Sequence, residues 1–236
     1  MASERSGQGR RNRLLAALTS EDHSLLTPYF KELSLELGWV LHEAGEPVEH
    51  IYFPHEGMVS LLAVMSDGQG IETATVGSEG VVGAMSGFGI RRGFTRAVVQ
   101  APLVASRISS VQFHTAVQKS EGLRNLMVSY NEALLAQVQQ TAACNALHAT
   151  ESRLARWLLQ TRDRVDSDVL PLTQDFLSQM LGVRRTTVTL VARQLEQAGV
   201  IQTRRGRIVI VDRKGLEDVA CECYAIVRDQ MSVPLP

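Results

Sequence analysis

Arginine and threonine side chains recur at helical spacing in residues 185–197. Val188, Val191 and Leu195 follow the i, i+3, i+7 spacing of a single helix face, which we expect to turn inward. Polar side chains on the opposite face can hydrogen bond to base edges and pair with phosphates. The residues on that face are Arg185, Thr186, Thr189, Leu190 and Arg193. We therefore expect this helix to contact the bases of DNA.

The region around this helix is strongly basic. Residues 151–214 contain twelve Lys or Arg and seven Asp or Glu, although the whole chain has a net charge of −1. Arg184 and Arg185 open the helix, where the helix dipole disfavours a cation, so their presence indicates an anion nearby. The basic cluster comprises Arg153, Arg156, Arg162, Arg164, Arg184, Arg185, Arg193, Arg204, Arg205 and Arg207. We expect these arginines to contact phosphates from one end of the molecule, the alternative being a solvated basic face.

The basic helix belongs to a longer pattern at residues 172–211. Thr173 can cap a first helix, and Gly182 can end it with a positive φ, so a tight turn separates two helices. Residues 200–211 are expected to form a short β-hairpin with an Arg-Gly tip. The pattern predicts a winged helix-turn-helix, the alternative being a winged fold used only for protein packing. The predicted DNA contacts are Thr173, Arg184, Arg185, Thr186, Thr189, Leu190, Arg193, Arg204, Arg205 and Arg207.

Short β-rich runs separated by glycines fill residues 35–108. Asp67-Gly68 between two of the runs is a hairpin signal, and the frequent glycines suit a compact roll or barrel. The runs cover residues 38–41, 50–53, 58–65, 71–76, 81–82 and 97–108. Residues 13–33 are expected to be helical, with Ser20 as a cap. We therefore expect a β-roll packed on a helical segment.

Residues 109–164 are expected to be helical, with apolar residues on two sides. One side, with Leu123, Met127 and Tyr130, would pack on the β-roll. The other has heptad-like spacing interrupted by asparagines, which fix the register of paired helices. It comprises Val128, Asn131, Leu135, Val138, Ala142 and Asn145. We expect this second side to pair with another subunit, the alternative being a helix buried within one subunit.

Length and composition are those of a two-domain globular protein. The chain has 236 residues and 44% hydrophobic content, and none of its apolar runs approaches the roughly 20 residues that span a bilayer. The polar, Arg-rich start lacks a signal core, so we expect residues 1–12 to be a disordered tail and the protein to be cytoplasmic. Phosphate-binding loops, nucleophile elbows and His-Glu-x-x-His motifs are not found in the sequence, so we expect no enzymatic activity.

Three cysteines, Cys144, Cys221 and Cys223, lack the spacing of a zinc site or of a disulfide framework. Cys221 and Cys223 are expected on opposite sides of a single helix at residues 212–230, so we expect no metal site. Cys144 lies on the predicted pairing helix and is a candidate for oxidation across a dimer axis. The simpler expectation is that all three are reduced thiols.

The order of β-roll, long helix and winged helix-turn-helix resembles the Crp/Fnr family of bacterial transcription regulators. The matching motifs are GWVLHEAGE at residues 38–46, EGMV at 56–59, EGVVG at 79–83, LTQ at 172–174 and GVRRTTV at 182–188. The resemblance implies an α+β fold with three parts: a jelly-roll (double-stranded β-helix) domain of the cyclic-nucleotide-binding type at residues 13–120, a dimerisation helix at 121–149 and a DNA-binding domain at 150–236. It further implies a homodimer on a palindromic operator and contact with RNA polymerase.

The predicted effector pocket departs from the nucleotide-binding members of the family. Those members have a Glu after the second glycine of the cassette and an Arg-Ser pair at its end. Here Gly83 is followed by Ala84, and Thr95 and Arg96 stand at the end. Because the charge-assisted contacts are lost, we expect the protein to bind no cyclic AMP or cyclic GMP, and to bind an unknown small-molecule effector or none. Haem is the alternative, with His42, His50, His55, His114 and His148 as candidate ligands.

The predicted reading helix departs from the family as well. Members present Arg, Glu and a second Arg to the bases, and the matching residues here are Arg185, Thr186 and Leu190. Arg185 can take a guanine edge, whereas Thr186 cannot accept from cytosine as a carboxylate would, and Leu190 offers only apolar contact. We therefore expect a transcription regulator with a different operator. The alternative is a ligand-binding or protein-interaction module that keeps the winged fold without binding an operator.

Overall fold

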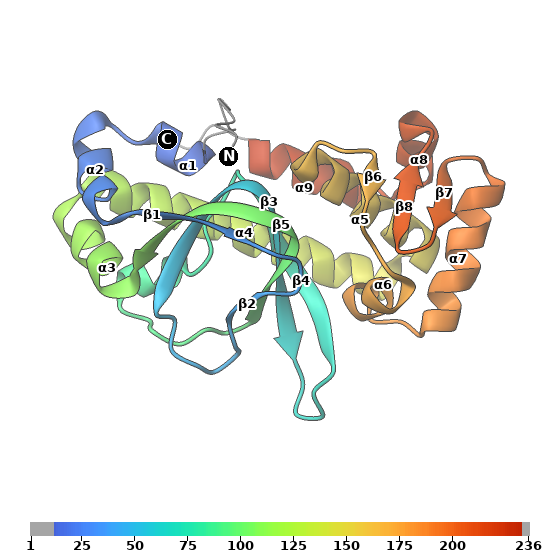
Figure 1. Ribbon diagram of the computed structural model, residues 1–236, viewed down its shortest axis with the longest axis horizontal. Helices are drawn as coiled ribbons and strands as arrows, with labels where there is room; N and C mark the ends of the chain where they lie inside the picture. Colours follow the sequence, from blue (N-terminus) through green and yellow to red (C-terminus); the bar gives the residue numbers. More distant parts are fainter. Residues whose placement is uncertain (1–11, 233–236) are drawn as a thin grey trace, which may run out of the picture.

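The computed structural model describes residues 12–232, in which a long helix joins two domains (Figure 1). The tail predicted at residues 1–12 lies outside the described residues, apart from Asn12. This residue is buried and caps α1 (Arg13–Ala17), and its side-chain amide donates to the carbonyls of Pro54 (2.9 Å) and Gly80 (2.7 Å). The chain is therefore attached to the N-terminal domain from its first described residue.

The N-terminal domain is built on an antiparallel sheet in the order β1-β5-β3-β4, with β2 also paired to β5. Its strands are β1 (Lys31–Leu35), β2 (Val40–His42), β3 (His50–Val64), β4 (Gly70–Val76) and β5 (Arg96–Ser109). The runs expected at 50–53 and 58–65 form one bent strand, β3. Gly57 stands at the bend with φ +85°, and a Cβ there would lie 2.1 Å from the Pro102 carbonyl oxygen. Only glycine fits this close approach of two strands. The hairpin predicted at Asp67-Gly68 joins β3 to β4.

The N-terminal helical segment is shorter than predicted. It consists of α1, α2 (Ser20–Ser24) and a 3-10 turn, η1 (Thr27–Tyr29), before β1 begins at Lys31. The cap of α2 is Thr19, whose side chain accepts from the Asp22 amide, and not Ser20. Residues 31–33 are strand because they pair with β5, a tertiary contact that overrides local helical periodicity.

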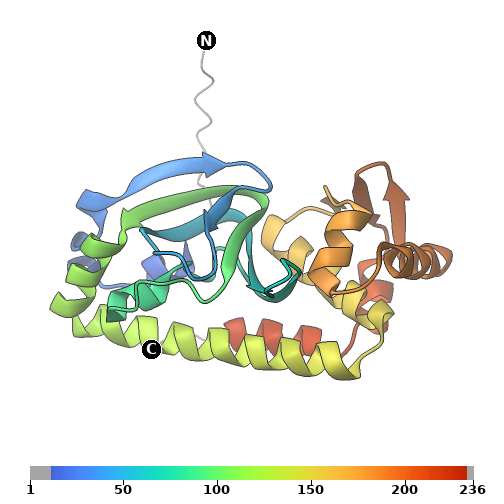
Figure 2. The same ribbon diagram turned by 90° about the horizontal axis from the view of Figure 1, so that it is seen from below.

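Three helices follow the sheet: α3 (Ser110–Lys119), α4 (Glu121–Leu147) and α5 (Thr150–Val165). Helix α4 runs beneath the N-terminal domain and ends beneath the C-terminal one (Figure 2). Leu123, Met127 and Tyr130 are buried on one side of α4, as predicted, whereas Val128 and Leu135 are 43% and 56% exposed on the other. Within residues 12–232, no helix is long and apolar enough to cross a membrane.

The C-terminal domain contains the predicted two helices and hairpin. Its elements are β6 (Val169–Leu170), α6 (Gln174–Leu181), α7 (Arg185–Gln197), β7 (Ile201–Arg204), β8 (Arg207–Ile210), α8 (Arg213–Val219) and α9 (Cys223–Ser232). The prediction of one helix over residues 212–230 is wrong. Ala220 adopts extended backbone (ψ 147°) between α8 and α9, so α9 can turn back to pack against α4 and α5.

Candidate nucleic-acid interface and effector pocket

Helices α6 and α7 form the helix-turn-helix predicted from the sequence. The Thr173 hydroxyl accepts from the Phe176 amide (3.2 Å), and Gly182 ends α6 in the left-handed conformation with φ +63°. Val188, Val191 and Leu195 of α7 are buried with Trp157 of α5 and other residues in a single core. Because this face of α7 is fixed inward, the opposite face is held toward solvent.

The outward face of α7 carries the predicted contact residues. Arg184, Arg185, Thr186 and Arg193 are exposed, Thr189 is half-buried, and Leu190 is 59% exposed. The Arg185 guanidinium lies 3.2 Å from the Asp175 carboxylate of α6, and the Thr189 hydroxyl donates to the Gln174 side chain (2.8 Å). These contacts orient two of the side chains on the exposed face of α7.

The wing carries three exposed arginines, Arg204, Arg205 and Arg207, around a tip at Gly206. It is anchored to α7 by Glu196, which accepts from the backbone amide (2.9 Å) and hydroxyl of Thr203. These hydrogen bonds hold the pKa of Glu196 below its usual range. The wing arginines and the face of α7 thus belong to one connected unit.

Part of the predicted basic cluster does not belong to this surface. Arg153 and Arg156 are 6% and 4% exposed, and they donate to the Leu181 carbonyl and to Gln160. Arg162 pairs with Asp168 at 2.9 Å. The prediction that all ten arginines face phosphate is therefore wrong, because those of α5 serve contacts within the protein.

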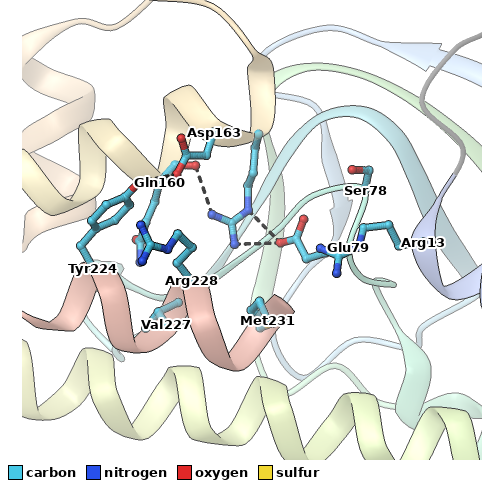
Figure 3. Close-up of a pocket in the computed structure, with 10 residues that line it drawn as sticks. Arg13, Ser78, Glu79, Gln160, Asp163, Tyr224, Val227, Arg228 and Met231 are labelled. Carbon is cyan, nitrogen blue, oxygen red and sulfur yellow. Dashed lines mark hydrogen bonds and ion pairs between the residues drawn. The ribbon is translucent and has the colours of Figure 1, made fainter. Parts of the chain in front are cut away.

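Arg164 links the two domains, a role that the sequence did not reveal. Its guanidinium lies 2.8 Å from the Glu79 carboxylate, and it borders a cavity of about 460 Å³ that α5, α9 and the 78–79 segment line (Figure 3). A second link joins Trp157 of α5 to Glu72 of β4, with the indole nitrogen 2.8 Å from the carboxylate. Burial raises the pKa of Glu72 to about 7. Glu72 and Glu79 belong to the N-terminal domain, and their partners, Trp157 and Arg164, both belong to α5.

A larger cavity, of about 680 Å³, lies between the N-terminal domain and α4. Gly83, Ala84 and Thr95 of the predicted effector pocket line it, and the 3-10 turn η2 (Ala84–Phe88) borders it. Arg96 does not line it and pairs instead with Glu43 at 3.4 Å. Most of the lining is apolar, including Val81, Phe88, Ile90, Phe94 and Leu134. The cavity is therefore lined mainly by apolar side chains, with Arg92 and His42 as its basic residues.

The five histidines considered for haem are scattered. His42 lines the larger cavity, His114 contacts the Gly87 carbonyl, and His55 contacts Ser106. The His50 ring is tilted against the Tyr52 ring, with 6.3 Å between the ring centroids, and His148 caps the C-terminal end of α4. The structure therefore does not bring these histidines into one pocket.

The three cysteines come together with His148, contrary to the spacing argument. Cys144 of α4 lies 3.5 Å from Cys221 (Sγ to Sγ), and Cys223 Sγ lies 3.4 Å from His148 Nδ1. Cys144 is fully buried against its own chain, so it does not face the exposed side of α4 as expected. The hydrogen bond from the Cys221 thiol holds the pKa of Cys144 well below its usual range. Sequence reasoning missed the cluster because it treated residues 212–230 as a single helix.

Both domains match known protein families. Residues 32–120 match the model of the cyclic nucleotide-binding domain, and residues 152–219 match that of the Crp-like helix-turn-helix domain. The transcriptional regulator SdrP of Thermus thermophilus is 27% identical over 201 residues, which cover 83% of this chain and 96% of SdrP. The global nitrogen regulator of Synechococcus elongatus is 24% identical over 213 residues, with 82% and 95% covered.

Solved structures agree with these matches. A transcriptional regulator of the CRP/FNR family from Thermus thermophilus has a TM-score of 0.67 at 25% identity, with 80% of this chain and 98% of that chain covered. FixK2 from Bradyrhizobium japonicum has a TM-score of 0.69 at 18% identity, covering 81% and 98%. The two domain matches, the order of the elements and these relatives lead to one conclusion: the chain belongs to the Crp/Fnr family of DNA-binding transcription regulators.

Proposed function

We propose that this regulator acts in the cytoplasm as a homodimer that reads a two-fold symmetric operator and contacts RNA polymerase. The observation that carries the proposal is the exposed face of α7, where arginine, threonine and leucine side chains lie opposite the buried face of the same helix. In a helix-turn-helix the second helix enters the major groove, and a dimer places two such helices one helical turn apart.

The exposed side of α4 supports pairing of two subunits. Val128 and Leu135 leave much of their apolar surface in solvent, with half-buried Asn131 and Val138 on the same side. An apolar stripe along a helix of 27 residues is the pattern of a coiled-coil seam, in which a polar residue fixes the register. We therefore place the subunit interface on this side of α4.

We assign the base contacts to α7, and the phosphate contacts to the wing and to the turn between α6 and α7. Arg185 reads guanine, Leu190 packs on a thymine methyl, and Thr186 replaces the carboxylate of other family members. Thr173, Thr189 and the remaining exposed arginines position the helix through the DNA backbone. The operator should accordingly differ from those of relatives at the bases that Thr186 and Leu190 face.

Selection of bound duplexes from a random library tests this function. We expect a two-fold symmetric sequence with a guanine in each half-site to be enriched. A protein that had kept the winged fold only as a ligand-binding or protein-interaction module would enrich no sequence, and that result would overturn the proposal.

For the N-terminal domain, we propose an effector other than a cyclic nucleotide. The larger cavity is lined mainly by apolar side chains, and the Arg96 guanidinium is paired with Glu43. Val128, Leu135 and Val138 of α4 also border the cavity, so a paired helix would lie beside its mouth. A small apolar molecule bound there would contact both the β-roll and the proposed subunit interface.

Millimolar cyclic AMP or cyclic GMP is expected to leave both the melting temperature and the operator affinity unchanged. A ligand at about 100 times its dissociation constant stabilises a one-site protein by roughly 2.7 kcal/mol, which thermal unfolding detects easily. The matched control is the Arg96→Ala variant. A clear stabilisation of the wild type that this substitution abolishes would show that Arg96 anchors a cyclic phosphate.

A further inference from the structure

Four side chains with metal-binding atoms converge where the long helix meets the C-terminal domain. Cys144 and His148 come from the last turn of α4 and its cap. Cys221 lies in the break between α8 and α9, and Cys223 is the first residue of α9. Their sulfur and nitrogen atoms all lie within 4.8 Å of one another. The three cysteines are buried and His148 is half-buried, so the group is closed on one side and reachable from the other.

The distances within this group are close to those of a tetrahedral metal site. A zinc ion about 2.3 Å from each sulfur and about 2.0 Å from a nitrogen holds its ligand atoms about 3.5 to 3.8 Å apart. Two of the pairs, Cys144 with Cys221 and Cys223 with His148, are separated by 3.5 and 3.4 Å. Small side-chain rotations would therefore complete the geometry without movement of the helices.

The surroundings of the group are also those of a metal site. His148 directs Nδ1 at Cys223, and its Nε2 lies 3.2 Å from the Glu222 carboxylate. Metal-ligating histidines commonly donate their second nitrogen to a carboxylate in this way, which fixes the ring. The Gln140 side chain donates to Cys223 Sγ (3.0 Å), as outer hydrogen bonds do to a ligating thiolate.

We propose that Cys144, His148, Cys221 and Cys223 bind one Zn²⁺ ion through three thiolates and the His148 Nδ1 atom. Soft sulfur donors with one imidazole, in a closed four-ligand set, select zinc over magnesium or calcium. Binding releases to solvent the protons of those cysteines that are still thiols, and the imidazole binds as the neutral ring. The Arg156 guanidinium lies within electrostatic range of Cys144 and offsets the net negative charge of three thiolates around a divalent ion.

The ion would fasten the C-terminal domain to the end of α4. His148 adopts extended backbone at the break between α4 and α5, so this break is the natural hinge between the long helix and the helix-turn-helix. Cys144 precedes this hinge and His148 forms it. Cys221 and Cys223 belong to the segment around the start of α9, the helix that packs back on α4. An occupied site therefore restricts the rotation of α6 and α7 relative to the long helix.

Cobalt substitution of the full-length, reduced and chelator-treated protein tests the site. We expect one Co²⁺ per chain, with the sulfur-to-cobalt charge-transfer absorption and the intense visible bands of a tetrahedral thiolate site, and full displacement of Co²⁺ by one equivalent of Zn²⁺. Cys223→Ser should weaken Co²⁺ binding at least 100-fold, and Glu222→Gln, which removes only the outer carboxylate, roughly tenfold. His148→Ala should also weaken it, whereas His23→Ala on distant α2 should not.

Three results would overturn the proposal. The first is a wild-type protein with reduced thiols that shows no thiolate absorption with Co²⁺. The second is Co²⁺ binding that Cys223→Ser and His148→Ala leave unchanged while circular dichroism shows both variants to be folded. The third is a protein that is isolated from cells with no bound zinc and that contains either iron with inorganic sulfide or a Cys144–Cys221 disulfide. Hydrogen exchange of the α4–α5 junction adds a separate readout, and we expect Zn²⁺ to slow it.

Discussion

Alanine in place of Arg185 is expected to lower operator affinity by at least about tenfold and to relax the choice of one base in each half-site. Arg185 is exposed at the first turn of α7, where its guanidinium can form two hydrogen bonds with a guanine edge. A bidentate pair of this kind contributes about 1 to 3 kcal/mol of discrimination, and a dimer uses two of them. Titration of the selected duplex and of duplexes with each base replaced measures both effects.

Arg205→Ala is the matched control for this prediction. Arg205 is exposed beside the wing tip, where we propose that its guanidinium contacts the DNA backbone rather than a base. We expect weaker binding to all sequences alike and a shallower dependence of affinity on salt, because one phosphate contact per subunit is lost. If both variants lost affinity equally for every sequence, Arg185 would not read a base.

A glutamate in place of Leu135 is expected to separate the subunits and to reduce operator affinity by on the order of 100-fold. Leu135 is 56% exposed in the single chain and lies in the middle of the proposed interface on α4. Two carboxylates facing each other across paired helices would be buried without partners, at a cost of about 3 kcal/mol or more. Sedimentation velocity and duplex titration of the same preparation measure both consequences.

Val111→Glu is the control for this substitution. Val111 is 58% exposed on α3, which is not the helix proposed to pair, so the same change should leave both mass and affinity unaltered. A Leu135→Glu protein that stays dimeric, with its fold intact by circular dichroism, would place the subunit interface elsewhere.

The helix-turn-helix was predictable because the signals that define it are local. Thr173 caps α6, Gly182 ends it, and the spacing of Val188 and Val191 orients α7, all within twenty residues. The hairpin at Asp67-Gly68 was predictable for the same reason. Such signals depend on backbone and side-chain preferences that act over one turn of structure.

Features that depend on distant residues were not predictable in the same way. The sequence shows that Arg153 and Arg156 are basic, but not that α5 is packed between two domains and turns them inward. The contacts of Glu72 with Trp157 and of Glu79 with Arg164 each join residues 85 positions apart. The cysteine cluster can form only because the helix breaks at Ala220, where the backbone is extended. The apolar spacing of the sequence on both sides of Ala220 predicted one continuous helix.

The spacing dependence of operator binding tests the central claim most directly. Two copies of the selected half-site are placed about 34 Å apart, or with about five base pairs inserted between them, and the complexes are weighed by native mass spectrometry during titration. We predict two chains on the first duplex at low concentration and a large loss of affinity on the second, where the half-sites face opposite sides of the helix. Equal affinity for both duplexes, or one chain per duplex throughout, would contradict a homodimer that reads a two-fold operator.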